Sequence, residues 1–187
     1  YRMDGVRTPR KGDKLLPTDL ETLLLPILDN RHRNELETNG QTDLAYAIPG
    51  VGRFRVNVYK QRGTLASAMR CLPFSIPDAD SLGIPAEVQA LTAKKRGLVL
   101  VTGPTGSGKS TTLASLVDIM NRKYPYHIIT LEDPIEYLHR HQYSMVNQRE
   151  IGSDSNDYAQ AIRAALREDP DVILVGEMRD RETITTA

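Results

Sequence analysis

The sequence is poor in cysteine and tryptophan, and it lacks any long apolar run. Its 187 residues include one cysteine and no tryptophan. Because a single cysteine cannot form a disulfide within the chain, a disulfide-stapled secreted domain is excluded and a cytoplasmic protein is favoured. Cys71 lies in an alternating apolar stretch, so we expect a buried, reduced thiol.

Two further absences narrow the possible partners. No apolar run approaches the roughly 20 residues that cross a bilayer, so we expect no transmembrane segment and only peripheral membrane contact. Basic and acidic residues each number 24, which leaves no net charge to favour nucleic acid. We therefore expect no nucleic-acid partner.

The length and the ends of the chain suggest two domains and a truncated sequence. Residues 73–85 hold three prolines, a glycine and several Asp and Ser residues, a composition typical of a connector. This predicts a first domain over residues 1–73, a linker over 74–84 and a second domain over 85–187. The chain begins with Tyr1 and stops in a helical pattern without a C-cap, so we expect truncation at both ends.

Periodicity predicts a different architecture for each domain. The first has helical spacing over residues 17–28 and 31–38, then alternation over 43–48, 53–59 and 65–72, which indicates an α+β domain with a small antiparallel sheet. The second begins with a helix over 85–95 and a continuous apolar run over 97–101, typical of a strand buried on both faces. Helices over 109–121 and 156–167 then alternate with strands over 127–131 and 171–175, which predicts a doubly wound α/β fold.

Residues 103–110, Gly-Pro-Thr-Gly-Ser-Gly-Lys-Ser, match the phosphate-loop pattern G-x-x-x-x-G-K-[ST] between a predicted strand and a predicted helix. The glycines let the loop N–H groups point inward, and Lys109 adds a cation at the β- and γ-phosphates. We therefore expect ATP and Mg²⁺ as cofactors, with Ser110 as a metal ligand. The expected nucleotide contacts are Gly103, Pro104, Thr105, Gly106, Ser107, Gly108, Lys109, Ser110 and Thr111.

Acidic residues follow two of the predicted strands. Glu177 comes after the strand over 171–175, at the sheet edge where ligands bind, and a carboxylate there can hold Mg²⁺ or orient water. Glu132, Asp133 and Glu136 crowd a proline-stiffened turn, which makes them candidates for a general base or for Mg²⁺ contacts. A helix cap, an ion pair or a solvated acidic turn remains the alternative explanation. The candidate metal ligands are Ser110, Glu132, Asp133 and Glu177.

Arginines alternate with apolar residues in the first domain. Most arginines in such positions are simply solvated. In a ring of subunits, however, a strand that bears arginines can reach the γ-phosphate of a neighbour, as arginine fingers do. Both explanations stay open for Arg53, Arg55, Arg62 and Arg70.

Three segments together resemble the type II/IV secretion ATPase superfamily: residues 103–113, 131–137 and 166–180. Within it, residues 49–57, 147–152 and 176–180 look like the twitching-motility ATPases that retract type IV pili. The resemblance implies a PAS-like N-terminal domain followed by a RecA-like P-loop ATPase domain that is incomplete at the C-terminus. It also implies a cytoplasmic homohexamer that hydrolyses ATP at the inner face of the cell membrane, with an inner-membrane pilus platform protein as partner.

The same resemblance assigns roles to individual residues. It makes Lys109 the Walker A lysine, Glu136 the catalytic base and Glu177 the Walker B glutamate. The arginines that it places at a subunit interface, near the nucleotide, are Arg53, Arg55 and Arg70. The family's His box lies downstream of the last residue, so we do not expect this chain to hydrolyse ATP alone.

Three alternative functions differ from retraction. A motor that assembles pili or drives type II secretion commonly carries a four-cysteine zinc insertion, and this chain has one cysteine. A nucleotide-dependent scaffold without turnover has no need of both Glu136 and Glu177. A small-molecule kinase gives no reason for an additional domain that bears arginines.

Overall fold

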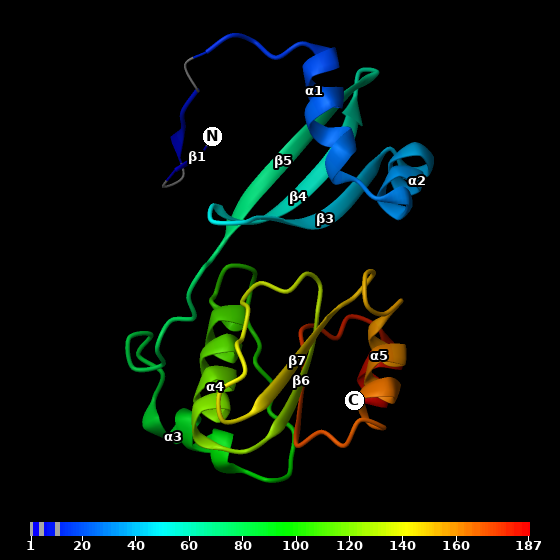
Figure 1. The fold of residues 1–187 in the computed structure, drawn as a ribbon. Helices are drawn as coiled ribbons and strands as arrows, with labels where there is room; N and C mark the ends of the chain where they lie inside the picture. Colours follow the sequence, from blue (N-terminus) through cyan, green and yellow to red (C-terminus); the bar gives the residue numbers. More distant parts are fainter. Residues whose placement is uncertain (1, 4–5, 10–11) are drawn as a thin grey trace. The chain divides into compact units, whose positions relative to one another are not determined.

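The computed structural model describes residues 2–3, 6–9 and 12–187, which divide into two compact units (Figure 1). The first unit comprises residues 1–46 and 55–70, and the second comprises 47–54 and 71–187. The predicted linker over 74–84 falls within the second unit of this division. The predicted domain bounds stay a prediction, and Tyr1, on which the expected N-terminal truncation rests, lies outside the described residues.

Short helices precede a three-stranded sheet in the first part of the chain. The elements are β1 (Arg2–Met3), β2 (Val6–Arg7), α1 (Pro17–Leu24), the 3₁₀ helix η1 (Leu25–Ile27), α2 (Asn30–Asn39), β3 (Gln41–Ile48), β4 (Gly52–Gln61) and β5 (Thr64–Leu72). Strands β1 and β2 pair antiparallel. The sheet order is β3-β4-β5, and the short connections over 49–51 and 62–63 permit only antiparallel neighbours.

The alternation predicted for β4 is confirmed. Val56 and Val58 are both 0% exposed, whereas Arg55, just before them, faces solvent and Asn57, between them, is half-buried. The prediction of a buried Cys71 is wrong, because its side chain is exposed. Successive side chains of a strand point to opposite faces, and here the neighbouring Leu72 takes the buried side.

The second unit alternates helices and strands as expected of a mixed α/β fold. Its elements are α3 (Ala86–Gln89), the 3₁₀ helix η2 (Ala90–Ala93), α4 (Lys109–Lys123), β6 (His127–Glu132), β7 (Met145–Glu150), α5 (Tyr158–Ala165), β8 (Val172–Val175) and α6 (Arg181–Thr186). The sheet order is β7-β6-β8, and both pairings are parallel. Helices α4 and α5 lie on opposite faces of this sheet (Figure 1).

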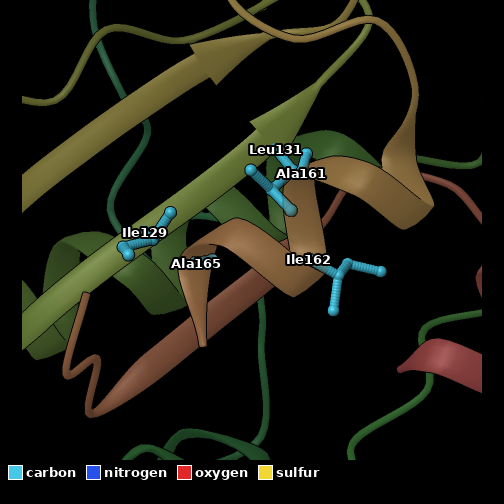
Figure 2. Close-up of a cluster of buried hydrophobic side chains, with 5 residues drawn as sticks. All are labelled: Ile129, Leu131, Ala161, Ile162 and Ala165. Atoms are coloured by element: carbon cyan, nitrogen blue, oxygen red, sulfur yellow. The ribbon is translucent and has the colours of Figure 1, made fainter. Parts of the chain in front are cut away.

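Strand β6 is the centre of the core because its alternate side chains pack on the two helix layers. Ile129 and Leu131 contact Ala161 and Ala165 of α5 (Figure 2). On the other face, Ile128 packs with Val117 of α4. The residues of β6 therefore form a nearly continuous apolar run, as parallel strands buried on both faces do.

The buried strand predicted over residues 97–101 is absent. These residues form neither helix nor strand, and Leu98, Val99 and Leu100 are 70%, 52% and 60% exposed. A strand needs a neighbouring strand for its backbone hydrogen bonds, and this run pairs with no strand of the described chain. Within the described residues, no helix is long and apolar enough to span a membrane.

Candidate active site

The phosphate loop leads into α4 through a left-handed glycine. Gly106 and Gly108 have φ values of 82° and 92°, a region that residues with a Cβ rarely adopt. Gly108 is the N-cap of α4, and no side chain caps the first turn. The unpaired N–H groups and the positive end of the helix dipole therefore remain available to an anion.

Lys109 folds back over its own loop. Its ammonium donates to the carbonyl oxygens of Gly103 and Pro104 at 2.8 and 2.9 Å. These contacts hold the cation over its own loop, and a phosphate oxygen can replace the carbonyls as acceptor. The donor set of the loop therefore fits the polyphosphate of a nucleotide.

Glu132, the last residue of β6, lines a small cavity together with Ser110 of α4. Its Oε1 accepts hydrogen bonds from Thr130 Oγ1 at 2.6 Å and from Gln148 Nε2 at 3.1 Å. Burial raises the pKa of the Glu132 carboxyl group, and these two hydrogen bonds oppose the shift. A half-buried carboxylate that shares a cavity with the Ser110 hydroxyl supplies two oxygen ligands of the kind that Mg²⁺ takes beside bound phosphates.

Glu177 reaches the same edge because β8 runs parallel to β6. Gly176 N donates to Leu131 O at 2.7 Å, and a Cβ on Gly176 would lie 3.0 Å from that oxygen. The absence of a side chain thus permits the close approach that brings Glu177 next to the end of β6. Glu177 is half-buried, and its Oε2 forms an ion pair with Arg179 at 2.8 Å.

Tyr158, at the start of α5, lies near the carboxylates at this edge of the sheet. Burial is the main reason that the pKa of its hydroxyl is raised, and the charges of Glu177, Asp133 and Glu132 add to the shift. All three carboxylates therefore act on one phenol. Tyr158 belongs to no motif that the sequence shows.

Hydrogen bonds hold the acidic turn after β6, residues 132–136, so this turn is not fully solvated. Ile135 N donates to Glu150 Oε2 at 3.1 Å, and Ile135 O accepts from Arg53 Nη2 at 2.9 Å. The Glu136 backbone also hydrogen-bonds to Glu132. Asp133 is exposed, whereas Glu136 is half-buried beside the sheet edge.

A second hydrogen bond connects this turn to α4. The hydroxyl groups of Thr111 and Tyr137 lie 3.1 Å apart. Gln148 contributes a further link, since it donates to Tyr137 O at 2.9 Å as well as to Glu132. The phosphate loop, the acidic turn and β7 therefore form one hydrogen-bonded group.

The predicted metal ligands are only partly assembled. Across the described part of the chain, no group of three or more His, Cys, Asp or Glu side chains is arranged to hold a metal ion. Mg²⁺ at nucleotide sites, however, takes one or two protein ligands and completes its shell with phosphates and water. Ser110 and Glu132 share the cavity, and Asp133 and Glu177 lie at its sheet edge.

The predicted arginines occupy different environments. Arg53 is half-buried and donates to Ile135 O of the same chain, while its Nη1 is buried without a partner. Arg55, Arg62 and Arg70 are exposed.

Residues 68–187 match the family described as "Type II/IV secretion system protein". The chain belongs to this type II/IV secretion family. Among curated members, the "Type IV pilus retractation ATPase PilT" of Pseudomonas aeruginosa is 45% identical over 168 residues, which cover 90% of this chain and 49% of PilT.

Other proteins are also similar to this chain over most of its length. The "Type IV pilus ATPase PilU" of P. aeruginosa is 37% identical over 186 residues, covering 100% of this chain and 49% of PilU. A crystal structure of the pilus retraction motor PilT with bound ADP superposes with a TM-score of 0.94 at 54% identity, over 99% of this chain and 54% of that one. The Legionella pneumophila ATPase DotB gives 0.81 at 31% identity, over 94% and 50%. The chain thus spans about half the length of these relatives.

Proposed function

We propose that this chain is the nucleotide-binding part of an ATP-hydrolysing motor that retracts type IV pili. The observation that carries the proposal is the common sheet edge of the phosphate loop, Glu132 and Glu177. Such an edge can hold a nucleotide and polarise water at its γ-phosphate. The pilus role is supported by the similarity of this chain to PilT and to the "Twitching motility protein" of Neisseria gonorrhoeae.

Each side chain of the site has a separate task in this proposal. Lys109 and the loop amides hold the phosphates. Ser110, together with one of the candidate carboxylates Glu132, Asp133 and Glu177, holds Mg²⁺, which neutralises developing charge. Glu136 accepts the proton of the attacking water as general base, and Glu177 orients that water. Both glutamates are half-buried, which leaves their carboxylates accessible to a substrate.

The proposed assembly follows the family. Residues 1–73 form a PAS-like domain, 74–84 a linker and 85–187 part of a RecA-like domain, in a cytoplasmic homohexamer at the inner face of the membrane. ATP hydrolysis moves the first domains against the second, and an inner-membrane platform protein transmits this motion to the pilus. Arg55 and Arg70, which are exposed, suit contacts across a subunit interface better than Arg53, which is held by Ile135 O.

Two substitutions in the complete gene product test the catalytic roles. Glu136→Gln and Glu177→Gln should each lower steady-state ATP turnover at least about 100-fold, the usual contribution of a positioned base. ATP binding, measured by equilibrium dialysis, should persist. Glu87→Gln, at an exposed position of α3, is the matched control. Unchanged turnover in either variant would contradict the role assigned to that glutamate.

A count of surface pili distinguishes retraction from the opposite motor. Cells that lack the gene should carry more pili than wild-type cells and should lose twitching motility, because pili are made but not withdrawn. Bald cells would instead identify a motor that assembles pili. That result would overturn the retraction role and leave the nucleotide chemistry in place.

A further inference from the structure

A polar pocket of about 360 Å³ lies in the second unit and shares no lining residue with the phosphate loop or the acidic turn. Three of its lining side chains are arginines. Its polar lining includes Arg149, Asp154, Asn156, Gln160, Arg163 and Arg167.

Helix α5 supplies one wall of this arginine pocket. One face of the helix is apolar and packs on the sheet, and the other face is polar. Ala161 and Ala165 pack on β6, so Gln160 and Arg163, on the other side of the helix, face outward. Arg167 lies four residues after Arg163, in the turn that follows α5, and extends the same row.

The opposite wall is a short loop fixed by its own backbone. Gly152 N donates to Ser155 O at 2.6 Å, and Asp154 N donates to Glu150 O at 2.8 Å. The Asp154 carboxylate accepts from Glu150 N at 2.7 Å. These bonds restrain the loop, which lowers the cost of ordering it around a ligand.

The guanidinium groups retain most of their donors. Arg149 bonds Glu168 Oε1 at 3.2 Å and Asp154 O at 3.3 Å, and Arg163 bonds Glu182 Oε1 at 3.2 Å. The Arg167 side chain has no hydrogen bond or ion pair within residues 12–187. Each guanidinium carries five N–H donors in a planar fork, so a compact oxyanion can still be bound by more than one of them.

We infer that the arginine pocket binds a small phosphate-bearing anion, independently of the nucleotide at the phosphate loop. Its volume lies in the range of small-molecule sites, and arginine forks match phosphate oxygens in bidentate geometry. The chain has equal numbers of basic and acidic residues, which does not favour a nucleic-acid polymer as the occupant.

The test titrates pyrophosphate, by calorimetry at fixed ionic strength and without Mg²⁺, into a Lys109→Gln variant of the complete protein. This background weakens the phosphate loop, so the test does not depend on the proposed function. Adding Arg167→Gln should weaken pyrophosphate binding by about tenfold, as for loss of one charge-assisted contact. Arg140→Gln, an exposed arginine outside the pocket, should change nothing.

Malonate tests the preference for phosphate over carboxylate. We expect it to bind at least about fivefold more weakly than pyrophosphate, because it offers fewer charged oxygens to the forks. Equal affinity for the two anions would overturn the phosphate assignment. Absence of binding, or the same affinity with and without Arg167→Gln, would overturn the site itself.

Discussion

Lys109 makes both of its hydrogen bonds with carbonyl oxygens of its own loop, at 2.8 and 2.9 Å. Replacing it with glutamine removes the cation that would bind the β- and γ-phosphates but leaves the glycine turn intact. We expect Lys109→Gln to weaken ADP binding by roughly 10- to 100-fold, the range for a lost hydrogen bond to a charged group. Fluorescence anisotropy of a labelled ADP measures this change.

Lys123, the last residue of the same helix, provides the control for Lys109. It is exposed, and Lys123→Gln removes the same charge from the opposite end of α4. ADP affinity should then remain that of the wild type. If both variants bind ADP equally well, the loop of this chain is not the nucleotide site.

Motifs locate the site residues that belong to one segment, but not those that meet through folding. The spacing of residues 103–110 was enough to predict a glycine-rich turn that leads into a helix. Gln148 was missed because its hydrogen bond to Glu132 depends on the pairing of β7 with β6. Tyr158 was missed because its position near the carboxylates depends on how α5 packs on β6. Each sits in a segment whose own pattern gives no sign of a ligand.

At the level of elements, helix α4 also organises the segment over 138–144 through a buried asparagine. Asn121 is 0% exposed, donates to Arg140 O at 2.7 Å and accepts from Gln142 N at 3.2 Å. Asn121→Ala leaves both backbone groups without this partner, so the free energy of unfolding should fall by about 1–3 kcal/mol. Urea unfolding followed by circular dichroism measures the loss.

Asn156 is the matched position for this prediction. It is exposed in the loop before α5, so Asn156→Ala should change the free energy of unfolding by less than about 0.5 kcal/mol. Equal losses in the two variants would mean that the Asn121 hydrogen bonds do not stabilise the fold.

Elements with a strong period were predictable, whereas those that depend on a neighbour were not. Helix α4 and strand β6 lie where the periodicity placed them. Strand β7 was missed because Asn147, Gln148 and Arg149 break its apolar pattern, although it pairs with β6 along its whole length. Residues 97–101 show the converse, since apolar character alone cannot supply a strand partner.

For the molecule as a whole, the order of helices and strands was enough to predict a parallel sheet with helices on both faces. That order could not show that a carboxylate lies in a partly buried cavity. The burial of such a carboxylate affects the stability of the entire fold. Glu132 has a raised pKa, caused mainly by burial. Between its unfolded and folded pKa values the folded protein binds more protons than the unfolded chain, so stability falls as pH rises through this window.

Glu132→Gln should remove this decline. The difference in melting temperature, variant minus wild type, should therefore become more positive from pH 4 to pH 7, because only the wild type pays for a buried negative charge at the higher pH. Differential scanning calorimetry at both pH values measures the difference, and Glu87→Gln controls for removal of one exposed negative charge. A difference that is the same at both pH values would show that Glu132 is ionised in the fold as readily as in the unfolded chain. In that case the hydrogen bonds from Thr130 and Gln148 fully offset the cost of burying the carboxylate.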